Sequence, residues 1–252
     1  MRLLLLATLI TVGSDTLRPV SPDLTLPSGI GTLDRLLMGG LHDGQFTHVF
    51  GEAASGKTTL ALQFVSAACR LGIRTILVNS ESSSPIERLE QVTGKEFRSL
   101  EDSVRILVPK DFDEQATVID DLELYARTGT GLVVVDTLTR LYRVVAEDKK
   151  SAYAAHRELN RQAGVLKGLA KHRGMAVLVL NQVRGRVDQD TGFEPVARNI
   201  MEYWGDFGIK MHVGGAPGER VLERVFPEGD YSKCILYMTS SGFTAVRDEK
   251  KQ

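Results

Sequence analysis

Cysteine and histidine are scarce in this sequence, which argues against a disulfide framework and against a metal centre. The chain of 252 residues contains two cysteines and five histidines. Cys69 lies in an apolar segment typical of a helix and Cys234 in one typical of a strand, so we expect two reduced thiols in the core. The histidines lack the spacing of metal ligands. The sequence therefore supports no cysteine or histidine metal site.

An excess of charge of either sign is also missing. The formal net charge is −1 at pH 7, and charged residues make up 25% of the chain. Because no global basic field attracts nucleic acid, any contact with DNA must come from a local patch. The apolar content of 42% is ordinary for a globular protein, and this length allows one large domain or two small ones.

The N-terminal apolar segment is too short to cross a bilayer. Residues 3–12 follow Arg2, whereas a transmembrane helix needs about 20 apolar residues. The segment is similar to the charged and apolar parts of a secretory signal. An incorrectly assigned start, a tail, or a short element docked on a partner are alternatives. We expect no membrane association, and we assign residues 1–27 to an N-terminal tail or linker.

From residue 46 onward, β-branched segments alternate with amphipathic ones. The expected strands are 46–50, 75–79, 104–108, 132–136 and 175–180, and the expected helices are 58–70, 85–92, 113–127 and 152–172. Such alternation predicts an α/β fold with a mostly parallel sheet flanked by helices. After residue 198, segments 207–213, 219–225, 233–239 and 243–246 lack intervening helices and predict an antiparallel extension of the same sheet. We expect one core domain, residues 28–247.

A glycine-rich segment fits the phosphate-loop pattern without a mismatch. We predict nucleotide binding by Gly51, Glu52, Ala53, Ala54, Ser55, Gly56, Lys57, Thr58 and Thr59. A predicted strand precedes the loop and a predicted helix follows it, which is the context that the motif requires. Loop N–H groups and the helix N-terminus bind phosphate, and Lys57 reaches the β- and γ-phosphates of ATP. The alternative is a chance glycine turn. Since a secreted protein meets little ATP, we expect a cytoplasmic location.

A carboxylate ends the apolar strand predicted at 132–136. Asp136 at such a strand end supports Mg²⁺ through water, and the hydroxyl of Thr58 holds the ion beside the phosphates. Many strands end in aspartate, and the alternative role for Asp136 is a helix N-cap. Its occurrence together with the phosphate loop favours a Mg²⁺ site at Thr58 and Asp136.

Two further polar residues follow predicted strands and are candidates for catalysis. Glu81, after the strand at 75–79, is placed to orient the attacking water. Gln182, after the strand at 175–180, is placed to bind the γ-phosphate or the water and to pass its presence to the next loop. A solvated loop glutamate and a simple polar turn are the alternatives.

Two segments offer basic residues for contact with DNA phosphates. The first is the long aperiodic stretch 183–199, which contains Arg184, Arg186 and Arg198; loops of this length are usually functional or disordered. The second is a predicted loop at 143–151 with Arg143, Lys149 and Lys150. Acidic residues in both segments dilute the positive charge, so a solvated linker is the alternative for the second.

Several short motifs occur in an order that is characteristic of one ATPase family. They are Phe50-Gly51-Glu52, Asn79-Ser80-Glu81, Val135-Asp136-Thr137, Asn181-Gln182-Val183 and Phe226-Pro227-Glu228-Gly229. Over residues 28–246 the chain resembles the ATPase core of the RecA/RadA recombinases, and more narrowly the RadB family of short archaeal RadA paralogues. The resemblance implies a RecA-like P-loop core, with Glu81 as the catalytic glutamate and Gln182 at the start of a DNA-binding loop.

The resemblance also implies a role and partners. The role is that of an ATP- and DNA-binding accessory factor of homologous recombination and DNA repair, with weak ATP hydrolysis and without strand exchange. The implied partners are single-stranded or branched DNA, a RadA-type recombinase, the Holliday-junction resolvase Hjc, and a second copy of the chain. Ala197 and Arg198 replace the paired glycines of the recombinases, which argues against strand exchange. The alternatives are a KaiC-like RecA-fold switch that acts without DNA, and an interaction module that binds ATP to set its shape.

Overall fold

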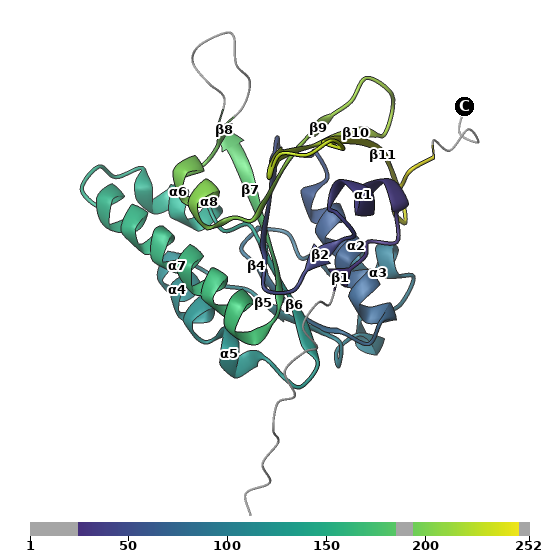
Figure 1. Cartoon of the computed structure of the whole chain (residues 1–252). Helices are drawn as coiled ribbons and strands as arrows, with labels where there is room; N and C mark the ends of the chain where they lie inside the picture. Colours follow the sequence, from purple (N-terminus) through teal and green to yellow (C-terminus); the bar gives the residue numbers. More distant parts are fainter. Residues whose placement is uncertain (1–24, 185–193, 247–252) are drawn as a thin grey trace, which may run out of the picture.

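The protein is built around one twisted, mostly parallel sheet (Figure 1). The computed structural model describes residues 25–184 and 194–246. Its main strands are β3 (Phe46–Gly51), β4 (Arg74–Asn79), β5 (Val104–Leu107), β6 (Thr130–Asp136), β7 (Ala176–Arg184), β9 (Phe207–Val213), β10 (Glu219–Phe226), β11 (Lys233–Thr239) and β12 (Gly242–Thr244). They lie in the order β12-β11-β10-β9-β3-β7-β6-β4-β5, and β8 (Glu194–Pro195) pairs with the end of β7. This confirms the predicted α/β fold.

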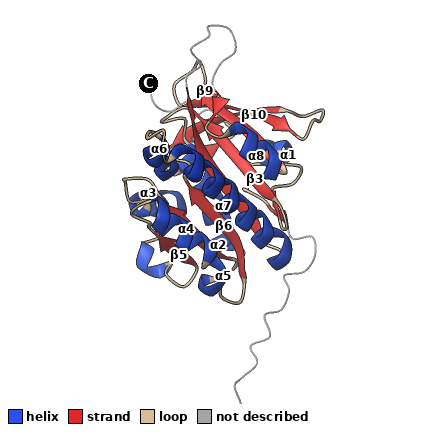
Figure 2. Ribbon diagram, turned by 90° about the vertical axis from the view of Figure 1, so that its left-hand side faces the viewer, coloured by secondary structure: helices blue, strands red, loops and turns tan. Residues whose placement is uncertain are grey.

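Helices cover both faces of the sheet (Figures 1 and 2). On one face pack α1 (Gly31–Leu36), α2 (Lys57–Arg70) and α3 (Ile86–Thr93); on the other pack α4 (Phe112–Asp120), α5 (Leu122–Tyr125), α6 (Arg140–Ala146), α7 (Ala152–Arg173) and α8 (Arg198–Trp204). Successive residues of a strand point to opposite faces, so Val134 joins the first core and Val133 and Val135 join the second. Every residue of β6 is buried, as expected for a parallel strand covered on both sides.

The long helix α7 packs on the core through the apolar stripe that its sequence predicts. Leu159, Ala163, Leu166 and Ala170 recur at intervals of three and four residues, and all four are fully buried. Gly174 ends the helix in the left-handed conformation, with φ of 59°, which glycine adopts without a steric penalty. No helix in the two described ranges is long and apolar enough to cross a membrane.

The C-terminal strands form the predicted extension, with one difference in direction. β9 pairs parallel with β3, so the antiparallel part begins only at β10, which pairs with both β9 and β11. β12 then pairs antiparallel with β11. The segment 214–218 connects β9 and β10 as a hairpin, in agreement with the sequence. The extension leaves one face partly open to solvent: Cys234 and Leu236 of β11 are buried, whereas Ile235 between them is 42% exposed.

Short elements account for most differences from the predicted pattern. Thr25 and Leu26, assigned to the tail, form β1 (Thr25–Leu26), which pairs with β2 (Leu41–His42) because Leu26 is buried in the core. The segment predicted as a helix at 113–127 is split into α4 and α5, and a single 3₁₀ turn, η1 (Phe97–Ser99), precedes β5. The helix α1 was not predicted; Leu33 and Leu36 anchor it in the core.

Candidate functional site

The phosphate loop connects β3 to α2 and is shaped by glycine at two positions. A Cβ atom on Gly51 would lie 2.0 Å from the carbonyl oxygen of Met211, so β9 leaves no room for a side chain. Gly56 has a φ of 98°, a conformation that other residues rarely adopt. Ala54 also has a positive φ, 59°. The structure therefore gives residues 51–58 the strand–loop–helix geometry that phosphate binding requires.

Lys57 is the cation at the centre of the loop. Its Nζ donates hydrogen bonds to the carbonyl oxygens of Gly51, at 3.0 Å, and Glu52, at 2.7 Å, and to Ser55 Oγ at 3.4 Å. Burial lowers the pKa of Lys57, while the carboxylates of Asp136, Glu81 and Glu52 act in the opposite direction. A buried ammonium with carboxylates near it is suited to a ligand that carries several negative charges.

Thr58 and Asp136 meet as the sequence predicts for a metal site. Thr58 Oγ1 donates to Asp136 Oδ2 at 2.6 Å. Asp136 is 3% exposed, and burial raises its pKa to about 6, against the hydrogen bond from Thr58. The two oxygen donors are of the kind that Mg²⁺ prefers, and a cation would stabilise the buried carboxylate. No cluster of three or more histidine, cysteine, aspartate or glutamate side chains suitable for a metal occurs in the described part of the chain.

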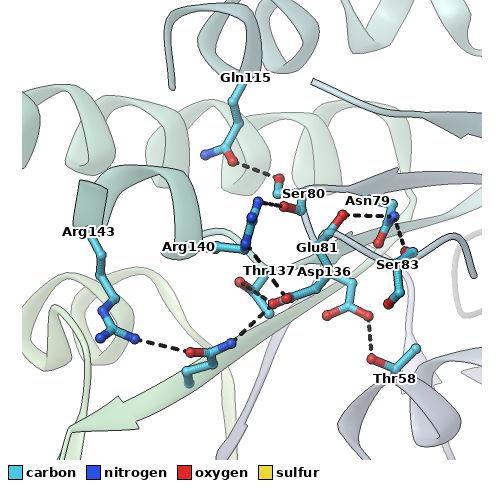
Figure 3. Close-up of polar contacts among 11 residues, drawn as sticks. Thr58, Asn79, Ser80, Glu81, Ser83, Gln115, Asp136, Thr137, Arg140 and Arg143 are labelled. Carbon is cyan, nitrogen blue, oxygen red and sulfur yellow. Dashed lines mark hydrogen bonds and ion pairs between the residues drawn. The ribbon is translucent and has the colours of Figure 1, made fainter. Parts of the chain in front are cut away.

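Glu81, just after β4, and Gln182, in β7, meet across the end of β6, which lies between these two strands. Figure 3 shows Glu81 among the polar contacts at these strand ends. Gln182 Nε2 donates to Glu81 Oε1 at 3.2 Å, and Thr137 Oγ1 donates to the same oxygen at 3.2 Å. The sheet register explains this meeting, because Asn79 lies opposite Asp136 and Asp136 lies opposite Leu180, so β4, β6 and β7 end at the same edge. The sequence places Asn181 and Gln182 after a strand, but β7 continues through both to Arg184, where β8 extends the pairing.

Two arginines of α6 hold this pair of side chains. Arg143 Nη1 donates to Gln182 Oε1 at 3.1 Å, so both ends of the Gln182 amide are engaged. Arg140 donates to the carbonyl oxygen of Ser80, and its Nε lies 3.9 Å from Glu81 Oε2. Arg140 is not predicted from the sequence, and Arg143 lies in a helix instead of the predicted loop at 143–151. Leu141 and Tyr142 are buried, which folds the segment into a helix and turns both arginines toward the site.

Hydrogen bonds of buried side-chain amides hold the strand ends in place. Ser80 Oγ donates to Gln115 Oε1 at 2.8 Å, and Gln115 Nε2 donates to Gln162 Oε1 at 2.8 Å and to the carbonyl oxygen of Leu138 at 3.0 Å. Asn181, which is fully buried, accepts a hydrogen bond from Thr139 Oγ1 at 3.1 Å. Satisfied buried polar networks of this kind fix side-chain and backbone positions.

A pocket of about 480 Å³ lies beside Glu81. Its lining combines the polar residues Asn79, Glu81 and the serines at 82–84 with apolar residues that include Phe97, Ile106 and Val108. This space borders the candidate catalytic carboxylate.

The predicted DNA-binding residues are only partly in the described structure. Arg184 is the last residue of β7, and Arg186 lies outside the described residues. Arg198 is not in a loop: it begins α8, after Ala197 in the left-handed conformation, and its Nε lies 2.7 Å from Glu202 Oε1 one turn later. Lys149 and Lys150 are exposed in the turn between α6 and α7.

The sheet order and the phosphate-loop geometry define a protein with the RecA-like P-loop ATPase fold. The family model described as the KaiC ATPase matches residues 26–142. A crystal structure of the RadB recombinase has a TM-score of 0.73 and 31% sequence identity, and the similarity covers 88% of this chain and 100% of that chain.

Similar curated proteins identify the family within this class. The DNA repair and recombination protein RadB of Methanococcoides burtonii is 30% identical over 220 residues, which are 86% of this chain and 96% of the relative. The protein of the same name from Methanosphaera stadtmanae is 30% identical over 232 residues, or 85% of this chain and 98% of the relative. The chain belongs to the RadB family.

Proposed function

We propose that this protein is an ATP- and DNA-binding accessory factor of homologous recombination and DNA repair, which hydrolyses ATP slowly and does not catalyse strand exchange. The relatives named DNA repair and recombination proteins support the recombination role. The observation that carries the proposal is the chain of contacts from Glu81 through Gln182 to Arg143, since it joins the ATP site to the strand that leads into the candidate DNA-binding segment.

ATP binds with its phosphates on the loop of residues 51–58. The loop N–H groups and the N-terminus of α2 bind the phosphate oxygens, and Lys57 exchanges its carbonyl contacts for the β- and γ-phosphates. Thr58 and Asp136 would hold Mg²⁺ at this position. When bound, the ion neutralises charge on the phosphates.

Glu81 orients the water that attacks the γ-phosphate. Thr137 and Gln182 both donate to Glu81 Oε1, which fixes the carboxylate at the strand end beside Asp136. A γ-phosphate that recruits the Gln182 amide removes its contacts with Glu81 and Arg143. The amide thereby links the nucleotide state to α6 and to the segment after β7.

DNA contacts the basic residues of both segments. Arg184 ends β7, Arg198 begins α8, and Lys149 and Lys150 are exposed in the turn after α6. Arg186 is assigned from the sequence alone. Phosphate contacts of this kind position DNA without reading its sequence. Single-stranded or branched DNA as the form bound is what the family resemblance implies. From the family resemblance we assign a RadA-type recombinase and the Hjc resolvase as partners, a second copy of the chain as a further one, and the cytoplasm as the location.

ATP turnover with and without single-stranded DNA tests the proposal. We expect slow phosphate release that DNA changes, and no ATP binding by Lys57→Ala, which removes the central cation while the fold is kept. Lys171→Ala, on the last turn of α7, is the matched control and should match the wild type. DNA-independent turnover with no DNA binding would instead favour a KaiC-like switch, which the family match over residues 26–142 makes the second candidate. Undiminished ATP affinity of Lys57→Ala would contradict the site.

A further inference from the structure

The back of the phosphate loop rests directly on the C-terminal strands. A Cβ atom on Gly56 would lie 2.4 Å from Met238 Cε and 2.9 Å from Phe243 Cζ. On Gly51 it would lie 2.0 Å from the carbonyl oxygen of Met211. These neighbours belong to β11, β12 and β9, which contribute none of the predicted ATP-site residues. The loop is thus packed between the nucleotide side and this part of the sheet.

One cation crosses from these strands to the loop. Arg220 of β10 donates from Nε to the carbonyl oxygen of Ser55 at 2.9 Å and from Nη2 to that of Ala54 at 3.4 Å. Its Nη1 donates to the carbonyl oxygen of Glu219 at 2.8 Å. All three acceptors are backbone carbonyls, and within the described residues no carboxylate pairs with Arg220. The positive charge therefore acts on loop peptide groups and is not neutralised by an acid.

The contact with Ser55 has a stereochemical consequence for Gly56. The peptide bond between them is trans, so the Ser55 carbonyl and the Gly56 N–H point in opposite directions. A guanidinium that holds the carbonyl toward β10 aims the Gly56 N–H away from β10, toward the open side of the loop. The charge also polarises the peptide unit and makes its N–H a stronger donor.

We infer that Arg220 is a positioning residue for phosphate binding, which holds the loop in the shape that presents the Gly56 N–H to the β-phosphate. This inference rests on the proposed ATP site and adds to that site a residue from β10. Arg220 does not touch the nucleotide; it acts through the Ala54 and Ser55 carbonyls.

Nucleotide titrations of two Arg220 variants test the inference. Arg220→Gln removes the charge, and Arg220→Lys keeps it within reach of one carbonyl. The probe is a fluorescent ADP analogue with Mg²⁺, displaced by inorganic pyrophosphate, which reports the loop alone. We expect Arg220→Gln to lower the affinity for both ligands about tenfold or more, because a charge-assisted hydrogen bond is lost. Arg220→Lys should recover part of this affinity.

The control is Lys233→Gln, which removes a cation from neighbouring β11 that is paired with Glu223 and does not touch the loop. It should bind like the wild type. Wild-type affinity in Arg220→Gln, an equal loss in Lys233→Gln, or an ADP defect without a pyrophosphate defect would each overturn the inference. A wild-type protein that binds no nucleotide would overturn the proposed function itself, so the two failures are distinguishable.

Discussion

The two halves of the sheet differ in how they are covered and in what they carry. All residues of β3 and β6 are buried, whereas β11 alternates between the buried Cys234 and Leu236 and the partly exposed Ile235. The parallel half places the candidate catalytic side chains at its strand ends, because the carboxyl ends of parallel strands meet at one edge. The C-terminal half supplies a packing surface and Arg220 behind the phosphate loop.

This difference indicates that the two halves of the sheet contribute different kinds of residues to one ATP site. The groups proposed for chemistry come from β3, β4, β6 and β7, where burial and hydrogen bonds fix them. The proposed support for the loop backbone comes from β9 to β12, whose side chains can change with less effect on the chemistry. Substitutions in the two halves should therefore have separable effects.

The largest effect, on the rate of ATP hydrolysis, should follow from a substitution of Glu81 after the carboxyl end of β4. Glu81→Gln keeps an oxygen that accepts from Thr137 and Gln182 but loses the charge that activates water. We expect ATP hydrolysis to fall by about 10²- to 10⁴-fold while ATP affinity stays within a few-fold of wild type. Phosphate-release assays measure it, with Glu87→Gln on α3 as the control. A rate unchanged by Glu81→Gln would remove Glu81 from the mechanism.

The effect of a truncated side chain on the free energy of unfolding should differ between the two halves of the sheet almost as strongly. Leu178→Ala creates a cavity at a fully buried position of β7 and should lower the free energy of unfolding by about 2–5 kcal/mol. Ile235→Ala, at the open face of β11, should cost about 1 kcal/mol or less, because the side chain is already 42% exposed. Urea unfolding of both variants checks this. Equal losses would mean that the C-terminal half is as closely packed as the parallel half.

Protonation of Asp136 gives a smaller, pH-dependent effect confined to the parallel half. Burial raises the pKa of Asp136 from 3.8 to about 6, so the folded protein holds this proton more tightly than the unfolded chain. Raising the pH from about 4 to about 6 therefore lowers the stability of the metal-free protein, and the loss is complete above that range. Asp136→Asn escapes this loss and should gain up to about 3 kcal/mol relative to wild type over the same interval.

Urea unfolding in EDTA at several pH values measures the difference between Asp136→Asn and wild type. The difference should grow from pH 4 to pH 6 and then stay constant. A constant difference across the whole range would show that burial does not perturb this carboxylate.

Long periodic elements were predictable from the sequence, and short ones were not. Strand β6 and helix α7 have patterns that their burial confirms, since Leu132 and Leu159 lie fully in the core. The helices α6 and α8 span seven residues each, too few for a period of 3.6 to be distinguished from a loop. They form because Tyr142 and Met201 are buried against neighbouring elements, which is a tertiary effect.

The same distinction applies to the site. Motif spacing alone predicted the meeting of Thr58 with Asp136, because the phosphate loop and the strand that ends in aspartate determine it. The contacts of Arg140 and Arg220 cross from other elements and carry no motif. One signal was present: Arg220 shares a strand face with the buried Leu222, and a cation at a core-facing position needs a polar partner.

Binding of single-stranded DNA tests the central claim that the ATP site and the DNA-binding segment are linked. Fluorescence anisotropy should be measured with and without ATP–Mg²⁺ across a salt series, for the wild type and for Gln182→Ala. We predict binding that weakens with salt, that changes with ATP in the wild type, and that loses its ATP dependence in Gln182→Ala. DNA affinity that is the same with and without ATP, or no binding at low salt, would contradict the account.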